Sequence, residues 1–83
     1  MELNDPEAIY NLGGYYYFGL YGLPQDYNKA LELYLWAGEL GHATAYGCIG
    51  GSYHSGRGVE RDMKKAKHYW ELAVIWGEWT GMA

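Results

Sequence analysis

The sequence predicts an all-α fold of two stacked helix–turn–helix units, because two residue patterns each occur twice. The first recurs at an offset of 37 residues: Ala8-x-x-x-Leu12-Gly13-x-x-Tyr16-x-x-Gly19 returns as Ala45-x-x-x-Ile49-Gly50-x-x-Tyr53-x-x-Gly56. The second recurs at an offset of 36: Asp26-x-x-Lys29-Ala30-x-x-x-Tyr34-x-x-Ala37-x-x-x-Gly41 returns as Asp62-x-x-Lys65-Ala66-x-x-x-Trp70-x-x-Ala73-x-x-x-Gly77. Repeats of this period are typical of helical arrays. The first unit therefore has one extra residue in its inner loop.

The first unit has clear start and stop signals for two helices. The segment 4–7, Asn-Asp-Pro-Glu, offers a polar cap, a proline in the first turn and an acid that the helix dipole favours. We expect that helix to end at about Phe18, where glycines and Pro24 break the chain. Asp26 caps the second helix and Gly41 ends it.

The second unit repeats this plan. Its first helix is expected from about Ala43 to Ser55, followed by a Gly-Arg-Gly turn. Asp62 caps its second helix, which is expected to end at about Trp76, before Gly77.

The chain of 83 residues is expected to form one domain. Repeat one covers about 5–41 and repeat two about 42–77. Residues 78–83 lie in the register of a third unit and are expected to form a truncated cap.

Composition excludes several classes of function. A net charge of −4 argues against nucleic-acid and anionic-membrane partners, which select for clustered Lys and Arg. The first half carries most of the acids and the second half most of the bases, so a basic partner would be steered toward repeat one. One Cys excludes an internal disulfide, and no apolar run is long enough for a signal peptide or membrane span. We expect a soluble, intracellular chain.

The ten Tyr, four Trp and one Phe of the chain exceed what two helical hairpins bury, which predicts exposed aromatic surface.

The repeated residues resemble the Sel-one-like repeat (SLR) family, which is related to the tetratricopeptide repeat, over nearly the whole chain. Small residues at the helix crossings and large aromatics between them agree with that resemblance: Gly13, Ala30, Gly50 and Ala66 against Tyr16, Tyr34, Tyr53 and Trp70. The resemblance implies a right-handed α-solenoid that acts as an adaptor or scaffold. Its first helices would line a concave surface for a protein or peptide, with no catalytic residues and no cofactor.

The departures from the family pattern indicate a resurfaced repeat. They are residues where the family usually has polar, charged or small side chains: Trp36, Gly47, Cys48, Gly51, Val74, Ile75 and Trp76, with Trp79 just beyond.

One face of the helix expected at 43–55 is a stripe of small residues: Thr44, Gly47, Cys48, Gly51 and Ser55. Gly47 and Gly51 each cost about 1 kcal/mol relative to Ala in a helix interior. We interpret the stripe as a trough that admits a bulky partner group, with His54 completing the candidate residues of this helix. The alternatives are that the glycines are tolerated defects, or that Tyr10 or Tyr17 fills the trough.

The matching face of the first helix is large and aromatic, and its candidate contact residues are Tyr10, Asn11, Gly14 and Tyr17. Trp36, Trp76 and Trp79 are further interface candidates, because Trp dominates binding hot spots. The alternative for Trp76 and Trp79 is self-capping, in which they fold back over Tyr69 and Leu72.

Titratable residues indicate no catalysis. His42, His54 and His68 lack metal-ligand spacing, and Cys48 and His54 fall on different faces of one helix, so neither a metal site nor a Cys nucleophile is expected. The sequence therefore predicts a non-enzymatic protein- or peptide-binding module. The alternatives are a homodimer formed through the apolar ends and the small-residue stripe, and small-molecule binding in the trough.

Overall fold

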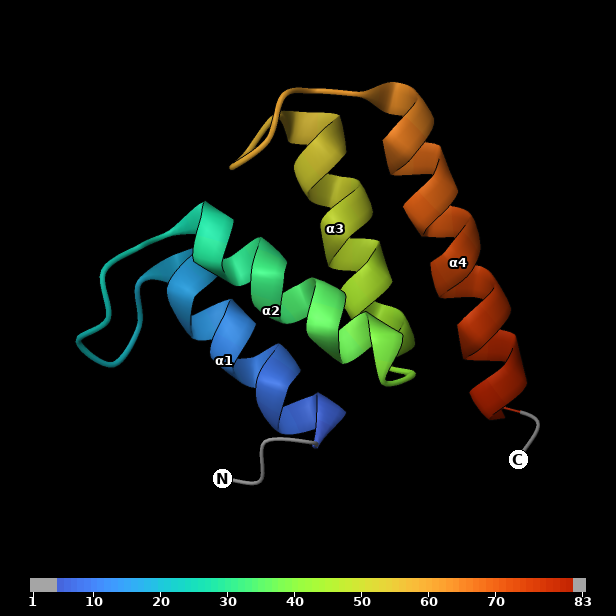
Figure 1. The fold of residues 1–83 in the computed structure, drawn as a ribbon, viewed down its shortest axis with the longest axis horizontal. Coiled ribbons are helices and arrows are strands. Elements are labelled where there is room, and N and C mark those ends of the chain that lie inside the picture. Colours follow the sequence, from blue (N-terminus) through green and yellow to red (C-terminus); the bar gives the residue numbers. More distant parts are fainter. Residues whose placement is uncertain (1–4, 82–83) are drawn as a thin grey trace.

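The structure, a computed structural model, describes the backbone of residues 5–81 and the side chains of residues 5–77. Over this span the chain forms four helices and no strand: α1 (Pro6–Phe18), α2 (Tyr27–Glu39), α3 (Ala43–Ser55) and α4 (Met63–Gly81). Each helix packs on the next along the chain (Figure 1). The Cα atoms span 37 × 32 × 14 Å, so the array is thin. The predicted all-α repeat architecture is confirmed.

The predicted aspartate caps begin three of the four helices. Asp5 accepts a hydrogen bond from the backbone N–H of Glu7 at 3.0 Å, and Asp26 accepts one from that of Lys29 at 3.1 Å. Asp62 does the same at the start of α4. These carboxylates satisfy N–H groups that have no partner inside the helix.

The expected end of α4 at Trp76 is wrong. Gly41 has φ +101° and follows α2, whereas its repeat equivalent Gly77 remains helical and α4 continues to Gly81. Glycine permits the left-handed conformation without requiring it. A Cβ at Gly77 would lie 3.9 Å from that of Ala43, so the helix runs on alongside the start of α3. Residues 78–81, which we expected to lie beyond this helix, form its last turn.

Each repeat closes on itself where a glycine of its first helix meets an aromatic ring of its second. A Cβ at Gly13 would lie 2.9 Å from the ring of Tyr34, and one at Gly50 would clash with the ring of Trp70. These two added Cβ atoms would also come within 3.4 Å of the Ala30 carbonyl and 3.0 Å of its equivalent in repeat two. Only glycine permits this approach, which explains why both repeats keep it.

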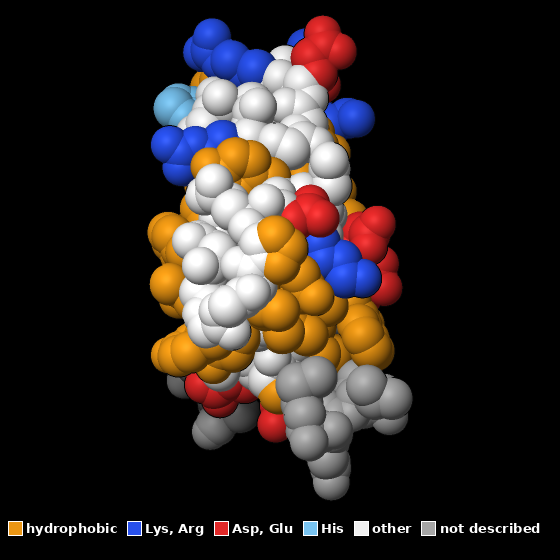
Figure 2. Space-filling model, turned by 90° about the vertical axis from the view of Figure 1, so that its left-hand side faces the viewer, with side chains coloured by type: hydrophobic (Ala, Val, Ile, Leu, Met, Phe, Trp, Pro, Cys, Tyr) orange, Lys and Arg blue, Asp and Glu red, His pale blue; other side chains and the backbone are white. Residues whose placement is uncertain are grey.

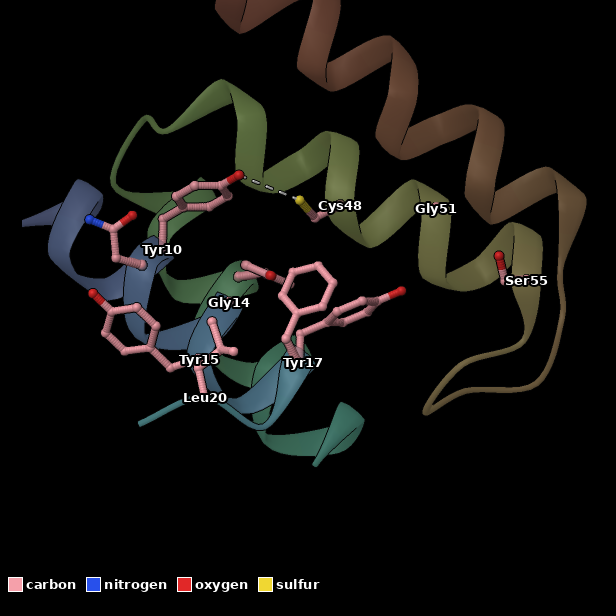
Figure 3. A pocket seen from close by; sticks show the side chains of 11 residues that line it. Tyr10, Gly14, Tyr15, Tyr17, Leu20, Cys48, Gly51 and Ser55 are labelled. Atoms are coloured by element: carbon pink, nitrogen blue, oxygen red, sulfur yellow. Dashed lines mark hydrogen bonds between the residues drawn. The ribbon is translucent and has the colours of Figure 1, made fainter. Parts of the chain in front are cut away.

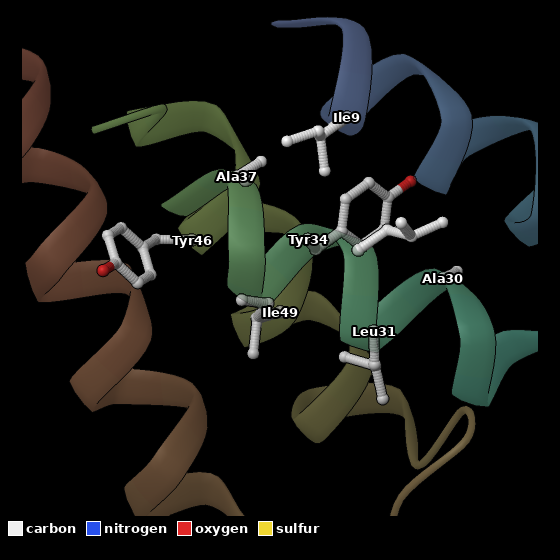
Figure 4. Close-up of a cluster of buried hydrophobic side chains, with 9 residues drawn as sticks. Ile9, Ala30, Leu31, Tyr34, Ala37, Tyr46 and Ile49 are labelled. Carbon is white, nitrogen blue, oxygen red and sulfur yellow. The ribbon is translucent and has the colours of Figure 1, made fainter. Parts of the chain in front are cut away.

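The main core lies between α1, α2 and α3 (Figure 4). Its buried residues are Ile9, Ala30, Leu31, Leu33, Tyr34, Ala37, Ala45, Tyr46 and Ile49. The two repeats are joined where the Tyr46 ring of α3 lies over Gly38 of α2, at which a Cβ would be 2.8 Å from the ring. On its other side Tyr46 stacks with Tyr69 of α4 at 6.2 Å between ring centroids.

The loops of the two repeats differ by one residue, as the offsets predict. The first helix of each repeat ends at a glycine in the left-handed conformation, Gly19 at φ +68° after α1 and Gly56 at φ +74° after α3. The first loop also contains Tyr21 at φ +56°, the one non-glycine residue with positive φ in the described backbone. This exposed Tyr21 packs edge-on against Tyr15, with 4.7 Å between centroids.

The surface is divided between an apolar middle and a cationic end. Seen from the side of the α1–α2 loop, hydrophobic side chains cover much of the middle, and Lys and Arg gather where the α3–α4 loop lies (Figure 2). That loop and the first turn of α4 contain Arg57, Arg61, Lys64 and Lys65. None of the helices in the described part of the chain combines the length and the hydropathy needed to cross a membrane.

Candidate binding groove between α1 and α3

A groove of about 460 Å³ lies along the exposed sides of α1 and α3 (Figure 3). It is lined mostly by aromatic and small residues: Tyr10, Asn11, Gly14, Tyr15, Tyr17, Phe18, Leu20, Tyr34, Cys48, Gly51 and Ser55. Because α1 and α3 are the first helices of the two repeats, the groove is built from equivalent faces that differ in side-chain size.

The wall on α3 is open because no described atom lies close to two of its glycines, Gly47 and Gly51. A Cβ added at Gly47 or at Gly51 would meet no atom within 4 Å. Neither Tyr10 nor Tyr17 therefore lies against Gly47 or Gly51, although Tyr10 reaches the stripe at Cys48. Figure 3 shows Cys48, Gly51 and Ser55 following one another along this wall.

The wall on α1 is held in place by ring contacts. Tyr10 stacks on His42 at 4.4 Å between centroids and tilts against Tyr34 at 5.5 Å. Its hydroxyl oxygen accepts a weak hydrogen bond from the Cys48 thiol, with 3.9 Å between Oη and Sγ. Tyr10 therefore reaches from α1 across to α3 and closes one end of the groove.

Tyr17 marks the other end of the α1 wall. Its ring packs against Phe18 at 4.8 Å and against Tyr27 at 5.0 Å. Arg57, from the α3–α4 loop, donates a 2.8 Å hydrogen bond to the Tyr17 hydroxyl, and its guanidinium carbon lies 6.0 Å from the ring centre. In the described part of the chain this exposed guanidinium has no carboxylate partner. It therefore places a positive charge on the rim.

The floor of the groove is uncharged at neutral pH. Burial raises the pKa of Tyr34, and the neighbouring Cys48 and Tyr10 raise it further. Burial also raises the pKa of the Tyr10 hydroxyl and of the Cys48 thiol, although hydrogen bonding between Cys48 and the hydroxyls of Tyr10 and Tyr34 partly opposes the rise for Cys48. A thiol held protonated is a poor nucleophile, so the groove has the chemistry of a binding surface.

Two exposed apolar side chains, Phe18 and Leu20, extend the groove at the end of α1. Single exposed apolar residues are ordinary, but these two continue a lining that is already apolar. The groove therefore opens onto an apolar lip beside the α1–α2 loop.

The structure brings together seven of the thirteen candidate residues named from the sequence: Tyr10, Asn11, Gly14, Tyr17, Cys48, Gly51 and Ser55. Thr44 and Gly47 belong to α3 without lining the groove, and exposed His54 packs against Trp70 at 5.6 Å. Trp36 and Trp76 are exposed but do not line the groove. The side chain of Trp79 lies outside the described residues.

Four lining residues were not among those candidates: Tyr15, Phe18, Leu20 and Tyr34. Tyr34 was assigned to the core because its spacing matched the buried face of α2; it does lie in the core, but it also lines the groove. Leu20 depends on the path of the α1–α2 loop, which helical periodicity does not encode. For Phe18 the signal was present, because it lies on the same predicted face as Tyr17.

Metal chemistry finds no support in the geometry. Among the residues that the structure describes, no three His, Cys, Asp or Glu side chains gather closely enough to hold an ion. Among the described residues the buried Nδ1 of His42 has no hydrogen-bond partner, and the His42 ring is covered by Tyr10.

Comparisons with known proteins agree on the architecture. The chain is 42% identical over 57 residues to the ERAD-associated E3 ubiquitin-protein ligase component HRD3A of Arabidopsis thaliana, covering 69% of this chain. It is 35% identical over 74 residues to HRD3B of the same plant, covering 88% of this chain. It spans only about a tenth of the length of these relatives, 8% of HRD3A and 11% of HRD3B.

The crystal structure of a Sel1 repeat protein from Oxalobacter formigenes matches the fold with a TM-score of 0.84 and 35% identity. That match covers 89% of this chain and 30% of the other. The Sel1 repeat itself matches residues 6–42 and 45–74, which correspond to the two helical pairs. The chain therefore belongs to the Sel1 repeat family.

Proposed function

We propose that this chain is a protein-binding module that receives a peptide segment of its partner in the groove between α1 and α3. The observation that carries the proposal is the pair of glycines on α3, which no part of the described molecule covers. Sel1 repeat proteins generally mediate protein–protein interactions, and the two relatives are named as components of a ligase assembly. An adaptor role for this chain is consistent with both.

The groove favours a particular kind of segment. The α3 wall at Gly51 and Cys48 leaves space for one bulky apolar or aromatic side chain, which the tyrosine wall of α1 would contact. Tyr supplies large contact area with few rotatable bonds, so little conformational entropy is lost on binding. The positive charge of Arg57 on the rim favours an acidic residue near that apolar side chain.

The experiment uses peptides selected from a random display library against the whole chain, with affinities measured by isothermal titration calorimetry. Gly51→Arg should weaken the affinity of the selected peptides at least tenfold, because the new side chain occupies the trough. The same substitution should not unfold the helix, since a side chain at this position meets open space and Gly is a weak helix former. Retained helical circular dichroism and an equal or higher melting temperature would show that the fold survives.

The matched control is Asn28→Arg, which adds the same charge at an exposed position of α2 that does not line the groove. It should leave peptide affinity within about twofold of the original chain, as expected for a surface position away from an interface. Equal affinity of the selected peptides for the Gly51→Arg variant would disprove binding in this groove.

A further inference from the structure

One end of the α1–α3 groove leads onto the cationic end of the molecule. The cations of that end are Arg57, Arg61, Lys64 and Lys65. Arg57 donates its hydrogen bond to the hydroxyl of the groove residue Tyr17, so its guanidinium lies where the groove stops. Figure 3 shows the groove residue Ser55 where α3 runs into the α3–α4 loop, and Figure 2 shows apolar and cationic side chains on one face. A segment that leaves the groove at this end therefore meets positive charge.

Arg61 is the next cation along this path, because the α3–α4 loop folds back toward the end of α3. Gly56 directly follows the groove residue Ser55, and a Cβ at Gly56 would lie 3.6 Å from the Cβ of Arg61. Both Arg57 and Arg61 are exposed. The cationic surface is therefore continuous with the groove.

The fold does not require most of these charges, since repeat one forms the same turn with neutral residues. Gln25 is the repeat equivalent of Arg61, and its Cβ lies 3.2 Å from the position of a Cβ at the glycine that ends α1. The Gln25 side chain donates a 3.0 Å hydrogen bond to the backbone carbonyl of Tyr17. Of the four cations only Lys65 has a cationic equivalent, Lys29. The positive charge of this turn is thus a feature of repeat two.

Two of the cations lie where a helix least favours them. The N-terminal end of a helix dipole is positive, and Lys64 and Lys65 are in the first turn of α4. Within the described residues their ammonium groups form no ion pair, because the Asp62 carboxylate accepts hydrogen bonds from their backbone N–H groups. The Lys65 ammonium lies instead 5.4 Å from the ring centre of Tyr53. Unpaired cations gathered against a helix dipole fit a surface that meets negative charge on a partner.

We propose that the partner segment has two parts, an apolar or aromatic anchor in the groove and, beyond Arg57, a run of Asp and Glu residues over the cationic end. This inference rests on the proposed function, because the anchor must occupy the groove for the run to reach Arg61 and Lys64. Glu60 lines a hollow beside Arg61 and opposes the run, so Glu60→Gln should strengthen binding of the acidic part.

The first test extends a peptide selected for the groove. Four Glu residues added at the end that leaves the groove by Arg57 should raise its affinity about tenfold at low salt, because several exposed ion pairs form together. The same extension at the other end should add little, so the comparison also gives the direction of the peptide. Four Gln residues are the control, and the gain should shrink at high salt. A Glu extension without effect at either end would overturn the proposal.

The second test gives the cationic end the residues that repeat one has. Arg61→Gln and Lys64→Asn should each reduce the gain from the Glu extension about two- to fivefold. Both should fold, because the same residues form the same turn in repeat one. Neither should change the affinity of the unextended peptide more than about twofold, since neither residue lines the groove.

The matched control for these variants is Lys29→Gln, which also removes one positive charge but from repeat one. It should leave the gain from the Glu extension unchanged, because a local contact does not depend on a distant cation. A gain that falls equally in all three variants would assign the effect to net charge and overturn binding at the cationic end.

Gly51→Arg separates this inference from the proposed function. It should weaken the extended and the unextended peptide alike, because both depend on the anchor. If the unextended peptide binds in the groove and the Glu extension adds nothing, the proposed function stands and only the acidic run is wrong. If Gly51→Arg changes neither affinity, the proposed function fails and this inference fails with it. A four-Glu peptide without an anchor that binds as tightly as the extended peptide would overturn the two-part segment.

Discussion

The two repeats place an aromatic ring against a glycine at equivalent positions, yet they bury these rings very differently. Tyr34 of repeat one is 4% exposed, whereas Trp70 of repeat two is 39% exposed. Both contact the glycine of their own repeat, Gly13 or Gly50. The difference comes from the neighbour, because α3 packs on α2 while no described residue packs on the outer side of α4. In a stacked array, the adjacent repeat determines how much a given position contributes to stability.

The largest effect should come from truncating these two rings. Tyr34→Ala should lower the free energy of unfolding by about 3–5 kcal/mol, the usual cost of removing a buried aromatic side chain. A domain of this size has little stability to spare, so the variant should be largely unfolded at 37 °C. Trp70→Ala should lower the same free energy by only about 1–2 kcal/mol, because part of its ring is already in water.

Urea unfolding followed by circular dichroism measures both variants. If the Trp70 variant loses as much stability as the Tyr34 variant, exposure does not control the contribution of the ring.

A second comparison concerns glycines that have different surroundings. A Cβ at Gly13 would lie 2.9 Å from the ring of Tyr34, which is confined by Tyr10 and Tyr17. Overpacking of this kind costs about 1–3 kcal/mol and should exceed the helix-propensity gain of about 1 kcal/mol. Gly13→Ala should therefore destabilise the chain. Gly51→Ala should stabilise it by up to about 1 kcal/mol, since no atom lies near its new methyl group.

Gly14→Ala is the matched control for this pair, because Gly14 is the repeat equivalent of Gly51. Its added Cβ would lie 3.7 Å from the Tyr34 hydroxyl, an ordinary contact, so it should behave like Gly51→Ala. Thermal unfolding of the three variants gives the order directly. A Gly13→Ala variant more stable than the original chain would mean that the Tyr34 ring can move aside.

High pH should weaken repeat one through a group that repeat two lacks. Burial raises the pKa of Tyr34, whose repeat equivalent Trp70 cannot ionise. The unfolded chain releases the phenol proton near the usual pKa of about 10, whereas the folded chain retains it to higher pH. The contribution to stability is therefore complete below pH of about 10 and is lost as the pH rises further.

Melting temperatures from neutral to strongly alkaline pH should fall less steeply in Tyr34→Phe than in the original chain. The pKa of the Cys48 thiol is raised as well, so the comparison is cleanest when both proteins also carry Cys48→Ala. Identical alkaline losses with and without the Tyr34 hydroxyl would assign the effect to other groups.

The sequence predicted the fold more fully than the groove, for physical reasons. The bounds of α3 and the aspartate caps follow from local signals, and the structure confirms them. The end of α4 was wrong because Gly77 allows a stop without forcing one. The groove residue Tyr34 was missed as a lining residue because it reaches the groove from α2, and such contacts depend on tertiary packing that the period of one helix does not contain.

The smallest effect concerns the rim, where the repeats differ in charge rather than in burial. Arg57 occurs in the α3–α4 loop, and the equivalent stretch of the α1–α2 loop has no cation. If the partner peptide places an acidic residue beside it, Arg57→Ala should weaken peptide affinity by about two- to fivefold, as for an exposed ion pair. The loss should disappear at high salt, because screening removes the same interaction from the original chain.

The control is Arg61→Ala, which removes one positive charge from the same loop at a residue that does not line the groove. Equal effects of the two substitutions would assign the salt dependence to long-range attraction by the whole cationic end, whereas an effect confined to Arg57 would place the acidic residue of the peptide at the Tyr17 rim.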